Sequence, residues 1–514
     1  MDGFVRRQSS TGSAAPQQRR QIGQTHRESG RPKQSTTQQS RNPTRDNSGS
    51  IALKLPKDTT KKRSRSNGKK QRSLMGGRLP KMRTMALVLL IAFGSYFITA
   101  AYLKARDVFQ GGGGAVALEE NIDPGKLTGE GDGRVNVLLL GKDDDADLTD
   151  TIIIASIDPI HDEAALLSIP RDLYVRVEGL GEMKINEVFP NARNAALAQQ
   201  TTERQAEVRA YRTLQEEIKK VTGIPMHYYA TIDFDGFRRA IDTVGGVTLD
   251  VEQPVYERMH LQGRQYILDV SEGRETFDGT RALAYVRSRK TSSRGDFDRS
   301  ERQREILIAL RDEILSSSTL TNPSRMNTLF NDFADNVNTS FSFEELLRLQ
   351  EIGRKIDTNN IDSLELVGDA PHDYIVSNML NGLSIQQPRA GMFDYSEIQR
   401  FVRTELRDGY LRSENATVLV LNGTDQPGLA TRTAEQLESY GYTVLEPADG
   451  PTQSQRETIL VDLTQGKKKY TKRYLEQRMQ TFASTRVPEG VVVDVDRADF
   501  VILIGQDEVT RLQN

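Results

Sequence analysis

The chain has 514 residues, which is enough for two or three domains and a sizeable core. It contains no cysteine, which excludes disulfide bonds, thiolate catalysis and thiolate zinc sites. Residues 1–84 carry 21 Lys and Arg against 4 Asp and Glu, whereas the remainder carries 48 against 67. This asymmetry predicts a basic tail that faces anionic partners, followed by an acidic remainder.

The N-terminal region predicts a tail and a membrane anchor. Residues 1–84 are rich in Gln, Ser, Thr, Arg and Gly without apolar periodicity, so we expect them to be disordered. Residues 85–103 (MALVLLIAFGSYFITAAYL) carry no charge, and this length crosses the hydrocarbon layer as one transmembrane helix. Basic residues crowd its N-terminal side, which predicts a cytoplasmic N-terminus and a single-pass protein of the cell membrane. No small-residue cleavage pattern follows, which favours a retained anchor over a cleaved signal peptide.

Alternating strands and helices follow a flexible stem at residues 104–130. Buried-strand patterns are expected at 135–140, 151–157 and 164–169. Residues 186–221 have helical spacing. The side chains expected to face inward there are Ala195, Ala196, Val208, Tyr211, Leu214 and Ile218.

The pattern continues with a helix at 234–244, a strand at 247–251 and an amphipathic helix at 299–316. This alternation predicts an α/β sheet domain over residues 131–405. A second, shorter pattern predicts a small αβ domain at residues 415–507, with a boundary near residue 410.

An acidic loop, GKDDDADLTDT at 141–151, connects the first two expected strands. Asp143 and Asp150 are among its carboxylates. Ligands gather at strand ends in open sheets, and Mg²⁺ binds through one or two carboxylates plus substrate phosphates. On composition alone, a solvated acidic loop is the more common interpretation.

An arginine-rich segment occupies residues 281–304. Arg287 and Arg289 alternate on an expected strand and would share a face. Arg299, Arg302 and Gln303 have helical spacing, and Arg171 follows an expected strand. Arginine forks match phosphate oxygens. A solvated surface or a nucleic-acid patch is the usual alternative. We expect no nucleic acid, because the predicted topology places this segment outside the cytoplasm.

Six stretches in order resemble the LytR–CpsA–Psr (LCP) family of cell-envelope proteins over about residues 130–400. These stretches are NVLLLGKD, TDTIIIASIDP, LLSIPRDLYV, KINEVF, DFDGFRRAIDTVGGVTLDV and ALAYVRSRKTSSRGDFDRSERQ. The segment ATVLVLNGTDQPGLATRTAEQL is similar to the LytR-type C-terminal domain of many members. The resemblance implies an LCP-type mixed sheet flanked by helices.

The resemblance also implies an activity: transfer of a glycopolymer from undecaprenyl pyrophosphate to peptidoglycan, with Mg²⁺ beside the pyrophosphate. Matching motifs imply that Asp143 and Asp150 bind the metal. The implied pyrophosphate-binding residues are Arg171, Arg287, Arg289, Arg299 and Gln303. Arg171, Asp150 and Asp296 are the implied catalytic residues. Leu148 stands where many members have arginine, which puts one head-group contact in doubt.

Three alternatives remain open on the sequence. Water could replace the sugar hydroxyl, which would make the protein a lipid-pyrophosphate hydrolase with the same pyrophosphate-binding residues. A transcriptional attenuator would need a DNA-binding unit in residues 1–84, where no helix-turn-helix pattern occurs. A non-catalytic wall-binding module fits the C-terminal unit at 415–507 better than the central domain. Separately, the apolar stretches 234–241 and 306–314 could line a channel for the lipid tail, although ordinary core is the simpler interpretation.

Overall fold

The computed structural model describes residues 114–119, 122–142, 148–261, 263–289, 296–367, 373–491 and 497–513. The predicted tail, the predicted transmembrane helix and Asp143 lie outside these residues. Among the helices that the structure does describe, none combines the length and the hydropathy needed to cross a membrane.

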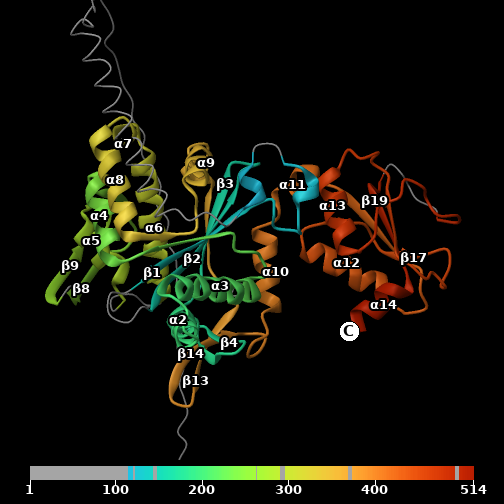
Figure 1. The fold of residues 1–514 in the computed structure, drawn as a ribbon, viewed down its shortest axis with the longest axis horizontal. Helices are drawn as coiled ribbons and strands as arrows, with labels where there is room; N and C mark the ends of the chain where they lie inside the picture. The colour runs from blue at the N-terminus through green and yellow to red at the C-terminus, as the bar shows by residue number, and fades with distance from the viewer. Residues whose placement is uncertain are drawn as a thin grey trace, which may run out of the picture. The chain divides into compact units, whose positions relative to one another are not determined.

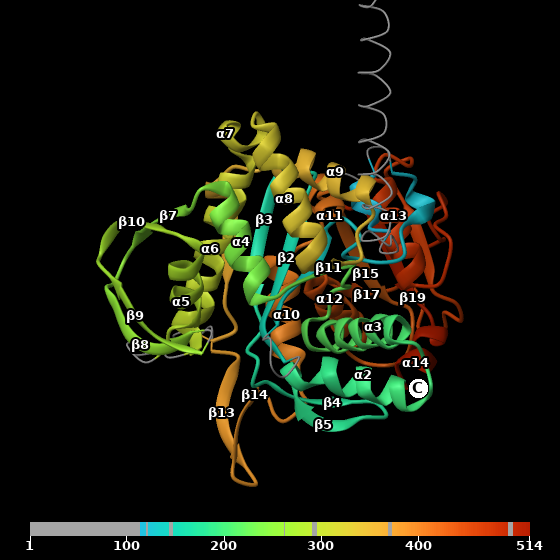
Figure 2. The ribbon, with the colours of Figure 1, turned by 60° about the vertical axis from the view of Figure 1, so that its left-hand side comes forward.

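A mixed six-stranded sheet is the centre of the fold, with strand order β11-β6-β1-β2-β3-β12 (Figures 1 and 2). Its strands are β1 Val135–Lys142, β2 Thr149–Asp158, β3 Glu163–Ser168, β6 Tyr228–Ile232, β11 Val337–Thr339 and β12 Ile361–Leu364. Strands β1, β2 and β3 pair antiparallel, whereas β1 with β6 and β3 with β12 are parallel. The three apolar runs expected as strands are therefore neighbours in one sheet.

Both faces of this sheet are buried, which explains the nearly continuous apolar runs. One face, with Leu138 and Ile154, packs against helices α2 Val188–Ala198, α3 Glu203–Thr222 and α10 Ser396–Glu405. The other face, with Val137 and Ile157, packs against η1 Val116–Leu118 and α9 Phe343–Gly353. Figure 1 shows α3 and α9 on opposite sides of the central strands.

A separate apolar cluster joins the arginine-rich region to the rest of the domain. It is formed by helices and two strand pairs that follow β6. These elements are α4 Phe234–Val244, β7 Val247–Val251, β8 Val255–Leu261, β9 Arg264–Val270, β10 Gly273–Phe277, α5 Gly279–Arg287, α6 Asp296–Leu315, α7 Ser317–Leu320 and α8 Pro323–Asn336. Ile241, Ile306 and Leu310, from the stretches considered for a lipid channel, are buried in this cluster.

The C-terminal part forms a second sheet, of order β16-β15-β19-β18, in which β17 also pairs with β15. Its elements are α11 Gly409–Glu414, β15 Thr417–Asn422, α12 Leu429–Ser439, β16 Thr443–Val444, β17 Ala448–Asp449, β18 Ile459–Asp462, α13 Lys469–Arg478, β19 Phe500–Ile504 and α14 Gln506–Gln513. The remaining elements are η2 Pro124–Lys126, β4 Tyr174–Val177, β5 Gly181–Lys184, η3 Ile185–Glu187, η4 Thr358–Asn360, β13 Ile375–Leu380 and β14 Leu383–Pro388. The expected α/β class, with a mixed sheet and a small C-terminal αβ unit, is confirmed.

Two expectations about local structure are wrong. Arg287 and Arg289 do not alternate on a strand, because Asp278 caps a helix, α5, that ends at Arg287. The helical spacing expected at 186–221 is confirmed, and it is divided between α2 and α3 because Thr202 starts α3 with a capping box. Val208 is 40% exposed on that second helix, although it was expected to face inward.

Candidate active site

Asp150 and Arg171 form an ion pair at one end of the central sheet. Asp150 lies near the start of β2, and Arg171 lies three residues beyond the end of β3. The ladder between these strands extends past β3, because Ile169 N–H donates to the Ile152 carbonyl at 2.9 Å. Arg171 Nη1 therefore reaches Asp150 Oδ1 at 2.6 Å. The side chains are 21% and 28% exposed, so the pair is open to a ligand.

Helix α6 brings a second guanidinium to this pair. Arg299 is buried in its first turns, and its Nη2 donates to the Asp150 carbonyl oxygen at 3.5 Å. One turn further along, Arg304 Nη1 donates to Ser168 Oγ at 2.8 Å and also contacts Glu365. Arg304 thus fastens α6 to the end of β3, which holds Arg299 beside Asp150. Residues from three distant segments converge here.

Arg302 and Gln303 face the end of α5 instead. Arg302 Nη1 donates to the carbonyl and the hydroxyl of Ser288, at 3.0 and 2.8 Å, and its guanidinium lies 5.6 Å from the Tyr285 ring centroid. Gln303 Nε2 donates to the Val286 carbonyl at 3.4 Å. These bonds tie α6 to the residues that carry Arg287 and Arg289.

The remaining arginines lie at the end of α5 and just beyond it. Arg287 is exposed, and its guanidinium carbon lies 4.7 Å from the Phe234 ring centroid. The Arg289 backbone N–H donates to Glu257 Oε2 at 2.7 Å. Asp296 is the first residue of α6. The structure therefore joins Asp150, Arg171 and Arg299, while Arg287, Arg289 and Gln303 lie around the α5–α6 connection.

Burial shifts the pKa values of two side chains near the end of α5. The Tyr285 hydroxyl donates to Glu305 Oε2 at 3.1 Å. Burial raises the pKa of Glu305, and it also raises the pKa of Tyr285. Desolvation thus works against the charged form of the carboxyl next to Arg302.

Lys142 and Asn186 belong to this end of the sheet, although sequence reasoning gave them no role. Lys142 ends β1, and its Nζ lies 4.6 Å from the Phe189 ring centroid. The Asn186 N–H donates to the Arg171 carbonyl at 3.3 Å, and its own carbonyl accepts from Thr149 Oγ1 at 3.3 Å. The buried Asn186 Oδ1 has no hydrogen-bond partner among the described residues. Asn186 belongs to the KINEVF motif, which is the sequence feature that could have identified it.

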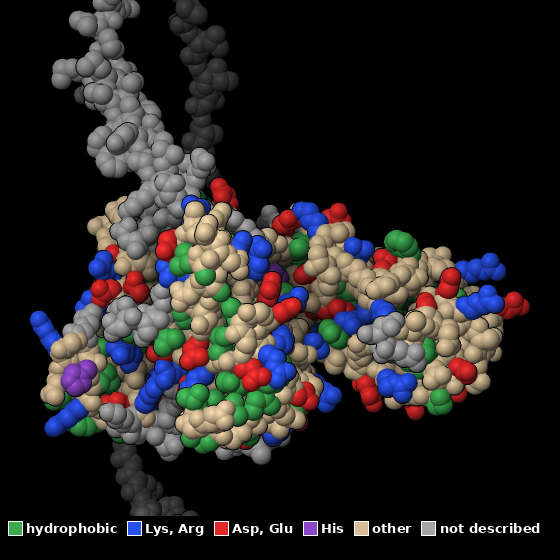
Figure 3. All heavy atoms as spheres, turned by 60° about the horizontal axis from the view of Figure 1, so that its bottom comes forward, with side chains coloured by type: hydrophobic (Ala, Val, Ile, Leu, Met, Phe, Trp, Pro, Cys, Tyr) green, Lys and Arg blue, Asp and Glu red, His purple; other side chains and the backbone are tan. Residues whose placement is uncertain are grey.

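A magnesium ion at this end of the sheet would need carboxylate ligands from the protein. Within the described part of the chain, no three His, Cys, Asp or Glu side chains gather as metal ligands. Asp150 offers one partly exposed carboxylate beside the arginines, and Mg²⁺ needs only one or two carboxylates when phosphates supply other ligands. Asp150 is therefore suited to supply one of the two carboxylate ligands that are expected for the magnesium ion. Figure 3 shows Lys and Arg side chains on both halves of the visible face, interspersed with Asp and Glu side chains.

Comparisons with known proteins agree with the sequence motifs. The LytR_cpsA_psr family model matches residues 108–398, which is more than half of the chain. A second model, described as LytR cell envelope-related transcriptional attenuator, matches residues 415–507.

Two curated relatives and one solved structure are similar to this chain. Cell wall biosynthesis protein LcpA of Corynebacterium glutamicum is 30% identical over 60% of this chain and 61% of its own length. The polyisoprenyl-teichoic acid–peptidoglycan teichoic acid transferase TagU of Oceanobacillus iheyensis is 34% identical over 46% of this chain and 67% of its own length. The crystal structure of Bacillus subtilis TagV has a TM-score of 0.41 and 26% identity, over 53% of this chain and 97% of that chain.

Proposed function

Because the chain belongs to the LytR–CpsA–Psr family and carries a LytR-type C-terminal domain, we propose that it is a phosphotransferase of cell-wall assembly. It transfers a glycopolymer from an undecaprenyl-pyrophosphate carrier to peptidoglycan. The name of the Oceanobacillus relative gives polyisoprenyl-linked teichoic acid as its donor and peptidoglycan as its acceptor. Which glycopolymer this chain transfers is left open by the proposal.

The convergence of Arg171, Arg299 and Asp150 is the observation that carries this proposal. Guanidinium groups bind phosphate oxygens in a planar, two-pronged manner and stay charged at physiological pH. Two guanidinium groups that lie together at a partly exposed position suit a pyrophosphate. Phosphoryl transfer requires mainly this positioning and charge neutralisation.

The proposed residue roles combine this convergence with the motifs shared with the family. In the proposed reaction, the oxygen of a peptidoglycan sugar hydroxyl forms a bond to the polymer-side phosphorus. The bond from that phosphorus to the bridging oxygen breaks, and the carrier leaves as a monophosphate. The hydroxyl proton passes to a carboxylate, for which Asp150 and Asp296 are the candidates. The residues proposed to hold the pyrophosphate are Arg171, Arg287, Arg289, Arg299 and Gln303.

Asp143 and Asp150 would hold Mg²⁺. When bound, this ion neutralises phosphate charge that develops as the pyrophosphate bond breaks. The Arg171 ion pair keeps the Asp150 carboxylate in place before substrate arrives.

The membrane topology is also part of the proposal. Residues 1–84 form a cytoplasmic tail, residues 85–103 cross the cell membrane, and residues 104–130 form the stem. The catalytic domain at 131–405 and the C-terminal domain at 415–507 then lie outside, where the lipid carrier presents its head group to the wall.

The test uses the full chain in detergent, with an undecaprenyl-pyrophosphate-linked teichoic acid precursor and un-cross-linked peptidoglycan. We expect attachment of the polymer to require the acceptor. Arg171→Ala and Asp150→Asn should each lower turnover by about 100-fold or more, because they remove charge where it is needed in the transition state. Arg176→Ala is the matched control, since Arg176 pairs with Glu182 on the exposed β4–β5 hairpin.

Two outcomes would contradict the proposal. Turnover that is unchanged in both Arg171→Ala and Asp150→Asn would place the chemistry elsewhere. Release of carrier monophosphate at full rate without peptidoglycan would identify a hydrolase.

A further inference from the structure

A cleft of about 500 Å³ lies at the opposite end of β2 from Asp150. It is bounded by η1, η2, the β2–β3 turn and three helices, α9, α11 and α13. Its lining includes the side chains of Ile160, Arg348, Tyr410, Lys469 and Tyr470. Because β2 runs from Thr149 to Asp158, a strand of this length separates the cleft from the Asp150–Arg171 ion pair by roughly 25 Å. The cleft is thus distinct from the proposed active site.

Two stacked tyrosines give the cleft an aromatic wall. The ring centroids of Tyr410 and Tyr470 lie 4.3 Å apart, with 25° between the ring planes. Lys469 is exposed, and its Nζ lies 4.7 Å from the Tyr470 centroid. An aromatic surface with polar groups at its edge suits a ligand that is apolar on one face and hydroxylated at its rim.

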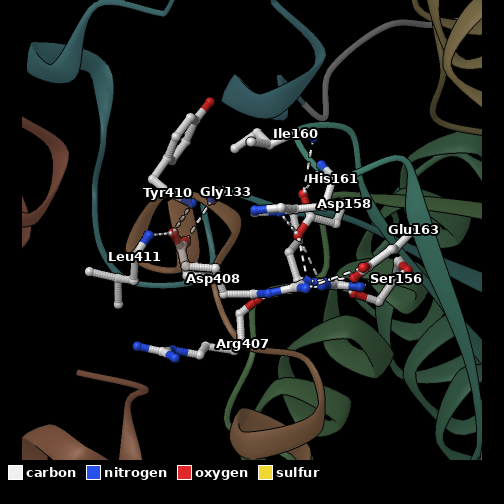
Figure 4. A network of polar contacts seen from close by, with 12 residues as sticks. Gly133, Ser156, Asp158, Ile160, His161, Glu163, Arg407, Asp408, Tyr410 and Leu411 are labelled. Carbon is white, nitrogen blue, oxygen red and sulfur yellow. Dashed lines mark hydrogen bonds and ion pairs between the residues drawn. The ribbon is translucent and has the colours of Figure 1, made fainter. Parts of the chain in front are cut away.

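The Tyr410 hydroxyl adds a second, independent observation. Tyr410 is only 5% exposed, and its hydroxyl has no hydrogen-bond partner among the described residues. Figure 4 shows this hydroxyl pointing away from Asp408, on the side where Ile160 lies. Burial raises the pKa of Tyr410, so the phenol keeps its proton and can donate. A ligand oxygen in the cleft would satisfy this buried donor.

The charged groups that line the cleft balance one another. Arg348 Nε donates to the Leu118 carbonyl at 3.1 Å, and Arg348 Nη1 pairs with Glu351 at 2.9 Å. The carboxylates of Glu119 and Asp123 also line the cleft. These two carboxylates balance the charges of Arg348 and Lys469, so the lining has no excess charge that would select a charged ligand.

We propose that this cleft is a saccharide-binding site, in which a pyranose ring lies against the partly exposed Tyr470 and accepts a hydrogen bond from the Tyr410 hydroxyl. Lys469 contacts the sugar at the mouth of the cleft. The choice of glycan rests on the proposed function: it is either the peptidoglycan strand or the transferred polymer.

The experiment measures glycan binding to the full chain in detergent by calorimetry. One probe is an oligomer of alternating N-acetylglucosamine and N-acetylmuramic acid, and the other is soluble teichoic acid without its lipid. We expect Tyr470→Ala to weaken binding about tenfold, and Tyr410→Phe about fivefold through one lost hydrogen bond. The matched controls are Tyr256→Phe on β8 and, for Lys469→Ala, the neighbouring exposed Lys467→Ala.

The results separate this proposal from the enzymatic one. Arg171→Ala should abolish turnover and leave glycan binding unchanged. Binding of either probe that falls only in the cleft variants supports the site and identifies its glycan. The proposal is overturned if wild-type protein binds neither probe at millimolar concentration, or if Tyr470→Ala and Tyr410→Phe bind as wild type. Loss of binding to phosphatidylglycerol vesicles in Lys469→Ala, without glycan binding, would instead identify a membrane contact and overturn it.

Discussion

Two ion pairs that involve residues of β2 differ in how far their side chains are exposed to solvent. Arg171 and Asp150 are about one quarter exposed, and such pairs contribute at most about 1 kcal/mol to stability. Arg134 and Asp158, 3.6 Å apart, are 4% and 0% exposed. Losing one member of a buried pair costs several kcal/mol, because the other charge is left unpaired. The accessible pair is therefore free to serve a substrate, whereas the buried pair serves the fold.

His227 makes stability depend on pH. Its Nδ1 accepts a hydrogen bond from the Asn136 N–H at 3.0 Å, which requires an unprotonated nitrogen. Burial lowers the pKa of His227 from 6.5 to about 4. The unfolded chain therefore binds a proton at a higher pH than the folded chain does. Stability from this residue is complete above pH 6.5 and is lost as the pH falls towards 4.

We predict that His227→Asn flattens this dependence, since Asn Oδ1 can accept the same hydrogen bond without titrating. At pH 5 the histidine costs about 2 kcal/mol relative to neutral pH, and the variant should not lose this amount. Thermal unfolding at pH 7 and pH 5 measures the difference. The exposed His260→Asn on β8 is the control. An identical pH dependence in wild type and His227→Asn would contradict the prediction.

Elements with clear end signals could be predicted from the sequence to the residue. Helix α4 spans the expected 234–244, because Asp233 caps its start and Gly245 adopts φ 99° at its end. Strand β7 also coincides with the expected 247–251. In both cases local chemistry alone determines the boundary.

Elsewhere tertiary packing overrides the local pattern. The stretch ALAYVR resembles an alternating strand, yet residues 282–286 are all buried on a short helix inside an apolar cluster. The residues of the candidate site were named through motif resemblance. That Arg299 reaches the Asp150 carbonyl depends on Arg304 fastening α6 to β3, a contact with no local sequence signal.

At the scale of elements, the segment that leads into α11 is organised by one carboxylate. Asp408 Oδ1 accepts from the N–H groups of Tyr410 and Leu411, and caps α11. Its Oδ2 accepts from the N–H groups of Gly131 and Gly133 and from the hydroxyl of Tyr474. Figure 4 shows the contacts of Asp408 with Gly133, Tyr410 and Leu411. A Cβ at Gly133 would lie 2.6 Å from Asp408 Oδ1, so only glycine fits there.

We predict that Asp408→Asn destabilises the protein by about 2–4 kcal/mol, because the amide nitrogen would face donors and leave at least one of them unpaired. The midpoint of thermal unfolding should fall accordingly. Asp425→Asn, an exposed position in the turn after β15, is the control and should change little. Equal midpoints for Asp408→Asn and the control would show that these contacts are dispensable.

At the scale of the whole molecule, Glu130 links the segment before β1 to the C-terminal unit. Its carboxylate accepts from Arg478 at 2.8 and 2.9 Å and from the Tyr442 hydroxyl at 2.7 Å. Both side chains of the ion pair are nearly buried. The Arg478 guanidinium carbon also lies 3.6 Å from the Tyr440 ring centroid. A second link joins Arg412 of α11 to Asp158 and Glu163 of the central sheet.

The pKa of Glu130 predicts how the first link responds to acid. Burial opposes ionisation, but the hydrogen bonds and charge of Arg478 outweigh it and lower the pKa of Glu130. A carboxyl with a lowered folded-state pKa stabilises the fold above its unfolded-state pKa, and this stabilisation is lost as the pH falls. The link between the two parts should therefore weaken at acidic pH.

We predict that Glu130→Gln reproduces this loss at neutral pH, because the amide leaves the Arg478 charge uncompensated in a nearly buried position, at a cost of about 2–4 kcal/mol. Limited proteolysis between the two parts should become faster, and thermal unfolding should begin at a lower temperature. Glu119→Gln removes an exposed carboxylate that pairs with Lys126 at 2.7 Å, and should change stability by under about 1 kcal/mol. If both variants resisted protease as wild type does, Arg412 and its partners would be sufficient to hold the C-terminal unit, and the Glu130 link would be unnecessary.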